Sequence, residues 1–194
     1  MAGVLVLHAW WGLNDDVREY ARRLAGEGFA VETPDLYGGG RVVSDIAAAQ
    51  ALLKARDEVK QQDEIDRAVD RLAAQGPVAV IGWSMGGSLG WDLVARRPGT
   101  VAALVDHYGG GWPDPGAKLP PIIGHYGELD DDPPVSMVRE LEQRARSASP
   151  EFHIYPGAKH WFAEPSRPQY DPAATALAWE RTLRFLKQHL TPSH

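Results

Sequence analysis

The 194-residue sequence contains no cysteine, no cluster of basic residues and no long apolar run. Without cysteine there is no disulfide framework, no Cys-ligated zinc and no thiol nucleophile. The 26 acidic residues outnumber the 20 basic ones, for a net charge of −6, which argues against a surface for nucleic acids or anionic membranes. No apolar stretch approaches the ~18 residues of a membrane span, and no Lys or Arg precedes Arg18 as a signal peptide would require. We therefore expect a cytoplasmic protein.

The usual patterns of metal and phosphate sites are also missing. Asp130–Asp132 places three carboxylates in a row, but adjacent residues of an extended segment point in different directions and no histidine at ligand spacing accompanies them. Gly38–Gly40 lacks the Lys-Ser/Thr ending of a phosphate loop and does not lie between a strand and a helix. We expect neither a metal ion nor another cofactor.

Short apolar segments alternate with helical patterns along the whole chain. Val4–Leu7 and Val78–Ile81 are continuous apolar runs, typical of strands buried on both faces. Further strands are predicted at 29–31, 101–105, 122–123 and 152–154, and helices at about 15–26, 44–56, 63–75, 85–97, 135–148 and from 172 onward. This alternation predicts an α/β protein with a mostly parallel sheet of about six strands and helices on both faces. Since no repeat or linker interrupts it, we expect a single domain over residues 1–194, without a large lid.

The pattern Gly82-Trp83-Ser84-Met85-Gly86, followed by another glycine, comes directly after the Val78–Ile81 strand. It is typical of a nucleophile elbow, a strained turn between a strand and a helix that holds a serine hydroxyl above the sheet. Glycines flank the serine because side chains would clash where the chain folds back so tightly. The backbone N–H of Met85 would then face a developing oxyanion. Ser84 is the predicted nucleophile, and a Gly-rich turn without chemistry is the alternative.

A serine hydroxyl needs a base near neutral pH, and the base needs a carboxylate that orients it. In chains with such an elbow the order is Ser, then Asp or Glu, then His. Asp130 follows the fifth predicted strand and His160 follows the sixth. Both therefore lie at carboxyl ends of strands, where parallel sheets place their sites. We predict His160 as the general base and Asp130 as its partner, with Asp131, Asp132 and Glu128 as alternative carboxylates.

Four of the seven tryptophans lie beside these segments: Trp10, Trp11, Trp83 and Trp161. They either form an aromatic wall around an acyl or alcohol pocket or cover the top of the core. The sequence favours neither interpretation over the other.

Three segments together resemble the dienelactone hydrolase family of α/β-hydrolases. They are His8–Asn14 (His-Ala-Trp-Trp-Gly-Leu-Asn), Pro34–Tyr37 (Pro-Asp-Leu-Tyr) and Gly82–Gly87, in which a serine replaces the family's usual cysteine. The Gly-x-x-Asp of Gly127–Asp130 and the Gly-Ala-Lys-His of Gly157–His160 also match. The resemblance covers nearly the whole chain and implies a minimal α/β-hydrolase fold.

The resemblance implies further properties of the site. The backbone N–H of Trp10 would be the second oxyanion donor, beside that of Met85. Ala9 stands where the type enzymes carry a glutamate that contacts the cysteine, and a Ser-His-Asp triad has no thiolate to manage. Glu164 stands where the type enzyme places an arginine for its substrate's carboxylate. An acid there would repel such a substrate, so a neutral ester fits better than dienelactone.

The sequence thus predicts a serine hydrolase that cleaves small carboxylic esters through an acyl-enzyme. Candidate substrate-binding residues are Trp11, Trp83, Trp161 and Glu164. Two alternatives remain: a thioesterase or acyltransferase with the same triad, and a non-catalytic member of the fold that binds a small molecule or a protein partner. The sequence predicts neither the natural substrate nor the oligomeric state.

Overall fold

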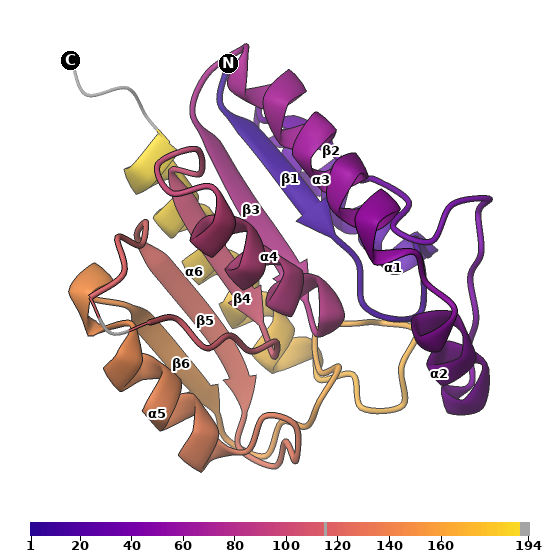
Figure 1. Cartoon of the computed structure of the whole chain (residues 1–194). Coiled ribbons are helices and arrows are strands. Elements are labelled where there is room, and N and C mark those ends of the chain that lie inside the picture. The colour runs from indigo at the N-terminus through magenta and orange to yellow at the C-terminus, as the bar shows by residue number, and fades with distance from the viewer. Residues whose placement is uncertain (115, 191–194) are drawn as a thin grey trace.

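A computed structural model describes residues 1–114 and 116–190, so residues 115 and 191–194 of the predicted domain lie outside the described residues. The described chain forms a sheet with the strand order β2-β1-β3-β4-β5-β6 (Figure 1). The strands are β1 Gly3–Leu7, β2 Ala30–Glu32, β3 Val78–Trp83, β4 Ala103–His107, β5 Ile122–Gly127 and β6 Glu151–Tyr155. Every neighbouring pair in this sheet is parallel. This confirms the predicted fold class, and the sheet is entirely parallel where a mostly parallel one was predicted.

Helices cover both faces of the sheet (Figure 1). The helices of the described chain are α1 Asp15–Gly26, α2 Ile46–Lys54, α3 Glu58–Ala73, α4 Met85–Arg96, α5 Val135–Arg144 and α6 Pro172–Leu190. Helices α1 and α6 pack on one face, while α3, α4 and α5 pack on the other. Within residues 1–114 and 116–190, none of the helices combines the length and the apolar character needed to cross a membrane.

The observed boundaries differ from the prediction where polar residues begin or end an element. Helix α3 starts at Glu58 instead of 63, because the Asp57 side chain accepts a hydrogen bond from the Lys60 N–H at 3.1 Å and caps it. Its polar first turn carried no apolar pattern. The helix predicted over 135–148 ends at Arg144 and continues as a short 3₁₀ turn. The strand predicted from 101 starts at Ala103.

The two hydrophobic layers follow from the alternation of side chains along each strand. Val4 and Val6 of β1 pack in the layer of α1 and α6, whereas Leu5 and Leu7 pack in the layer of α3 and α4. All four side chains are buried, and burying each one stabilises the fold by roughly 1.5–3 kcal/mol. The central strands are thus fixed from both sides.

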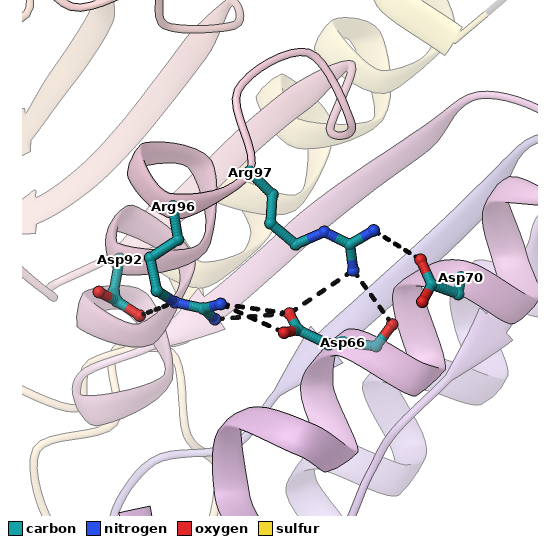
Figure 2. A network of polar contacts seen from close by, with 5 residues as sticks. All are labelled: Asp66, Asp70, Asp92, Arg96 and Arg97. Carbon is teal, nitrogen blue, oxygen red and sulfur yellow. Dashed lines mark hydrogen bonds and ion pairs between the residues drawn. The ribbon is translucent and has the colours of Figure 1, made fainter. Parts of the chain in front are cut away.

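A network of ion pairs joins α3 to the carboxyl end of α4 (Figure 2). Asp66 lies between two arginines: its carboxylate is 3.2 Å from the Arg96 Nη1 and 3.6 Å from the Arg97 Nη1. Asp92 and Asp70 complete the network at 2.7 and 2.6 Å. Because these side chains are partly exposed, each pair contributes about 1 kcal/mol or less. The network fixes the outer surface of the two helices and lies apart from the sheet's carboxyl edge.

The parallel arrangement brings the carboxyl ends of the strands to one edge of the sheet. The loops at this edge carry the predicted site residues: Trp10 after β1, Ser84 after β3, Asp130 after β5 and His160 after β6. Residues that are far apart in the sequence therefore meet there.

Candidate active site

The turn between β3 and α4 holds Ser84 in a strained conformation, with φ at 51° and ψ at −113°. The turn closes tightly because its neighbours are glycines. A Cβ on Gly82 would collide with the Gly86 carbonyl, and a Cβ on Gly86 would collide with the Leu7 carbonyl. The Ser84 N–H donates to the His107 carbonyl at 2.9 Å. The strand-turn-helix context expected of a nucleophile elbow is therefore present.

Ser84, His160 and Asp130 form one continuous chain of hydrogen bonds. The Ser84 Oγ lies 2.9 Å from the His160 Nε2, and the His160 Nδ1 lies 2.8 Å from the Asp130 Oδ2. Because a carboxylate only accepts hydrogen bonds, Nδ1 carries the imidazole proton. Nε2 is then free to accept the proton of the serine hydroxyl. The structure thus brings together the three residues predicted as nucleophile, base and orienting carboxylate.

Only Asp130 among the candidate carboxylates reaches the imidazole. Its side chain is fully buried, and its Oδ1 accepts the Asp132 N–H at 2.8 Å. The side chains of Asp131 and Asp132 are exposed. Glu128 accepts the Gly157 N–H at 2.9 Å and so ties the loop after β5 to the loop that carries His160. The alternatives left open by the sequence are therefore surface residues or supports of these loops.

The two predicted oxyanion donors lie on neighbouring segments. Met85 is the first residue of α4, so its N–H has no acceptor within the helix and lies at the positive end of the helix dipole. Tyr37 connects this residue to Trp10. Its hydroxyl donates to the Trp10 carbonyl at 3.1 Å and lies 3.5 Å from the Met85 Sδ.

Three of the four tryptophans form a cluster beside the imidazole. Trp10 stacks on Trp161 with ring centroids 6.0 Å apart, and Trp11 packs edge-on against Trp161 at 5.0 Å. The Trp161 ring lies 4.8 Å from that of His160. Trp10 and Trp161 are partly exposed, whereas Trp11 is 1% exposed. Trp11 is therefore the buried member of the cluster, packed against Trp10 and Trp161. The prediction that it contacts substrate does not fit its burial.

Trp83 belongs to the core on the other side of the elbow. Its ring packs edge-on against Tyr20 of α1 at 4.9 Å, and it forms part of the wall of a cavity of about 450 Å³ between α1 and residues 163–175. Neither Ser84 nor His160 lines this cavity. The prediction that Trp83 binds substrate at the serine is therefore not supported, because the alternation of side chains along β3 turns its ring toward α1.

Comparison with known proteins identifies the family. The sequence model of the dienelactone hydrolase family matches residues 1–190. The carboxymethylenebutenolidase 1 of Cupriavidus pinatubonensis is 30% identical in an alignment of 207 positions, gaps included, that covers 98% of this chain and 87% of the relative. The chain belongs to the dienelactone hydrolase family. The resemblance seen in the sequence motifs is thereby confirmed.

Solved structures extend this result to the fold. A dienelactone hydrolase-like promiscuous phosphotriesterase from metagenomic libraries is 26% identical, with a TM-score of 0.83 over 98% of this chain and 87% of its own. Esterase 2 of Thermogutta terrifontis, phosphorylated by paraoxon, superposes with a TM-score of 0.68 at 19% identity, over 99% and 84% of the two chains. The α/β-hydrolase fold predicted for this dienelactone hydrolase family member is therefore confirmed.

Glu164 takes a different place in this member of the dienelactone hydrolase family from the one predicted. Its side chain is fully buried, and its Oε1 accepts the Tyr108 hydroxyl at 3.1 Å. Burial raises the pKa of Glu164 to about 8, so the group is mostly protonated at neutral pH. A buried, neutral acid neither contacts nor repels a substrate. Its hydrogen bond instead joins residue 164 to Tyr108.

Tyr108 is a site residue that the sequence analysis missed. It follows β4 with a φ of 41°, and its ring packs edge-on against His160 at 5.0 Å. The His160 imidazole therefore contacts the rings of both Tyr108 and Trp161. Tyr108 and Glu164 are 56 positions apart in the sequence, so no local sequence pattern predicts their contact.

Asp106 is a second residue near the site that the sequence did not predict. It is fully buried at the end of β4 and accepts hydrogen bonds from the Trp91 Nε1 at 2.8 Å, the Tyr126 hydroxyl at 2.8 Å and the Gly109 N–H at 2.9 Å. Burial raises its pKa to about 6. A lone carboxylate directly after an apolar strand was the available clue. Asp106 shapes the loop that carries Tyr108.

Three histidines form a ladder across the sheet. His107, His125 and His153 are in register on β4, β5 and β6, with ring centroids 4.7 and 5.8 Å apart. Burial lowers the pKa of His107 to about 3 and that of His125 well below its usual range, so both are neutral. Their stacked rings are packing elements. Among residues 1–114 and 116–190, no group of three or more His, Asp or Glu side chains is arranged to hold a metal ion.

Proposed function

We propose that this member of the dienelactone hydrolase family is a serine hydrolase that cleaves small neutral carboxylic esters through an acyl-enzyme. The observation that carries the proposal is the hydrogen-bonded chain from Ser84 through His160 to the buried Asp130, with distances of 2.9 and 2.8 Å. Its nucleophile stands on a strained elbow at the carboxyl edge of a parallel sheet. This combination of an activated serine, a base and an orienting carboxylate serves acyl transfer.

In the first half of the reaction, His160 accepts the Ser84 hydroxyl proton on Nε2 while the serine oxygen attacks the ester carbonyl carbon. The imidazolium that forms is stabilised by the Asp130 carboxylate at Nδ1. As the tetrahedral intermediate collapses, the bond to the alcohol oxygen breaks and His160 gives its proton to that oxygen. The products of this half are a free alcohol and an acyl group on Ser84.

The second half repeats these steps with water. His160 removes a proton from water as the water oxygen attacks the acyl carbon, and a second tetrahedral intermediate forms. Its collapse returns the proton to the Ser84 oxygen and releases the carboxylic acid. The same groups act in both halves, so one base serves both acylation and deacylation.

The charge that develops on the carbonyl oxygen is assigned to two backbone donors, the N–H groups of Met85 and Trp10. The position of Met85 at the start of α4 supports this role, because a helix amino terminus stabilises negative charge. The bridge that Tyr37 forms between Trp10 and Met85 supports a shared function for the two segments. A donor of this kind contributes about 10²–10³ in kcat.

The surroundings of the triad favour a neutral substrate. Two aromatic side chains, Tyr108 and Trp161, contact the His160 ring. Arg167 is a nearby cation. Its Nη1 donates a hydrogen bond to the Ser44 carbonyl at 3.0 Å, and its Cζ lies over the Trp11 ring, 4.3 Å from the centroid. An aromatic surface of this type binds apolar acyl or alcohol groups. Trp161 is the proposed substrate contact among the tryptophans.

The direct test is hydrolysis of p-nitrophenyl acetate and butyrate by the wild type, by Ser84→Ala and by Ser88→Ala. Ser88 lies on the same helix and accepts the Gly110 N–H at 3.3 Å, so it is a matched control with no part in the triad. We expect Ser84→Ala to lose activity and Ser88→Ala to keep it. Retention of more than a few per cent of wild-type turnover by Ser84→Ala would contradict the proposal.

Two further measurements address the alternatives. Matched oxygen esters and thioesters with the same acyl group separate an esterase from a thioesterase, since the triad is common to both. Failure of every activated ester, together with measurable binding of the same esters by calorimetry, would replace the proposal with a non-catalytic binding role.

A further inference from the structure

The backbone on both sides of the Trp10 N–H is held by two side chains outside the triad, those of His8 and Tyr37. The Ala9 carbonyl, which belongs to the same peptide group as the Trp10 N–H, lies 2.6 Å from the His8 Nδ1. The Trp10 carbonyl accepts the Tyr37 hydroxyl at 3.1 Å. The Gly12 N–H also reaches the Ala9 carbonyl, at the longer distance of 3.3 Å.

The hydrogen bonds of His8 define its tautomer. The Leu36 N–H donates to the His8 Nε2 at 3.1 Å, so Nε2 has no proton. Nδ1 must then carry the proton and donate it to the Ala9 carbonyl. The ring is fully buried, and burial lowers its pKa to about 4. Near neutral pH the ring is therefore a neutral donor with a single orientation.

The geometry of a trans peptide turns this contact into control of the Trp10 N–H. The C=O and N–H of one planar peptide group point in opposite directions. Holding the Ala9 carbonyl against His8 therefore directs the Trp10 N–H away from His8. A hydrogen bond to the carbonyl also polarises the peptide group and strengthens its N–H as a donor.

The held segment lies against the elbow. A Cβ on Gly86 would collide with the Leu7 carbonyl and would lie 2.8 Å from the His8 carbonyl, so the first turn of α4 packs directly on the backbone that precedes Trp10. The Trp10 ring stacks on Trp161, which adjoins His160. The peptide group that His8 orients is thus within the proposed active site.

We propose that His8 and Tyr37 are positioning residues that aim the Trp10 N–H at the oxyanion by holding the carbonyls on either side of it. This inference rests on the proposed function, because an oxyanion forms only if the chain transfers acyl groups. It adds to that function a specific dependence of the chemical step on a buried neutral histidine outside the triad.

Two substitutions at His8 separate positioning from structure. Asparagine places an amide N–H donor about where His8 has Nδ1, whereas glutamine extends to about where Nε2 lies and leaves no donor near the Ala9 carbonyl. Each variant keeps one of the two hydrogen bonds, so both carry a comparable cost in stability. We expect His8→Asn to stay within a few-fold of wild-type kcat. His8→Gln is expected to lose about 10- to 100-fold in kcat, less than the 10²–10³ of removing an oxyanion donor outright.

The measurement is kcat and KM for p-nitrophenyl butyrate, with the thermal midpoint recorded for each variant. An oxyanion defect lowers kcat and leaves KM nearly unchanged, because the interaction forms only in the transition state. Equal kcat values for His8→Gln and the wild type would overturn the inference while the proposed function stands. A wild type that does not turn over esters, or whose ester turnover survives in Ser84→Ala, would overturn both.

Tyr37→Phe keeps the inference testable if His8→Gln does not fold. It removes only the hydroxyl that holds the Trp10 carbonyl. We expect kcat to fall several-fold at constant KM, and an unchanged kcat would contradict the positioning role. In a His8→Gln/Tyr37→Phe double variant, the two losses should be less than additive, since both substitutions release the same N–H.

Discussion

Replacing His107 with leucine is expected to make the protein less sensitive to acid. The His107 ring is buried in the sheet between Trp83 and His125, and neither of its nitrogens has a hydrogen-bond partner among the described residues. Leucine has a similar volume and no polar atoms. Because replacement of an unpartnered polar group by an apolar one is close to neutral or stabilising, the variant should be at least as stable as the wild type at pH 7.5.

The size of the effect follows from the pKa. Burial lowers the pKa of His107 to about 3, against 6.5 in an unfolded chain. Below pH 6.5 the unfolded state binds a proton that the folded state does not, so stability falls as the pH falls. The slope is about 1.4 kcal/mol per pH unit for one such histidine. Between pH 7.5 and 5.0 the wild type should lose about 2 kcal/mol through His107 alone.

The assay is urea unfolding followed by tryptophan fluorescence at pH 7.5 and 5.0. The pH-dependent loss should be smaller by about 2 kcal/mol in His107→Leu than in the wild type. His107→Gln is the matched control. His107→Gln should show the same reduced pH dependence as His107→Leu. It should be less stable than His107→Leu at both pH values, because it buries an unpaired amide. An identical loss in the wild type and His107→Leu would refute the assignment of acid sensitivity to this residue.

Three further outcomes are expected. Asp130→Asn should lower kcat by about 10⁴, because an amide favours the wrong tautomer of His160; steady-state kinetics check this, and a loss below tenfold would count against the triad. Glu164→Gln should raise the free energy of unfolding by up to about 4 kcal/mol at pH 8 and leave it unchanged at pH 4, because the raised pKa of about 8 makes ionisation of Glu164 destabilising as the pH rises from 4.5. Urea unfolding at both pH values measures this difference, and equal stability of the variant and the wild type at pH 8 would contradict the buried carboxyl. Gly86→Ala should destabilise the fold by about 3 kcal/mol or more, because its Cβ meets the Leu7 carbonyl; a thermal midpoint within 2 °C of the wild type would refute that collision.

Local sequence patterns were enough to predict the order of strands and helices. Asn14 caps α1, because its Oδ1 accepts the Val17 N–H at 3.2 Å. Asp171 caps α6 in the same way. The elbow at Ser84 could be recognised because its glycines are a local steric requirement. In each of these cases, the residues that decide the structure are close together in the sequence.

Contacts between distant segments could not be predicted in the same way. The burial of Trp83 depends on α1, which packs against it from a segment far away in the sequence. The histidine ladder depends on the register of β4, β5 and β6, which no single strand reveals. The pairing of Glu164 with Tyr108 converts an expected substrate contact into a structural support. The role of His8 likewise depends on where the chain after β2 returns to the sheet.

The most direct test of the account is to label the protein with a fluorophosphonate probe at neutral pH and locate the adduct by peptide mass spectrometry. We expect a single adduct on Ser84 that is lost in His160→Ala. Such a result would establish a serine activated by the imidazole that lies 2.9 Å from it. Absence of an adduct on Ser84 in the folded wild type would contradict the central claim, because the elbow would then be present without an activated nucleophile.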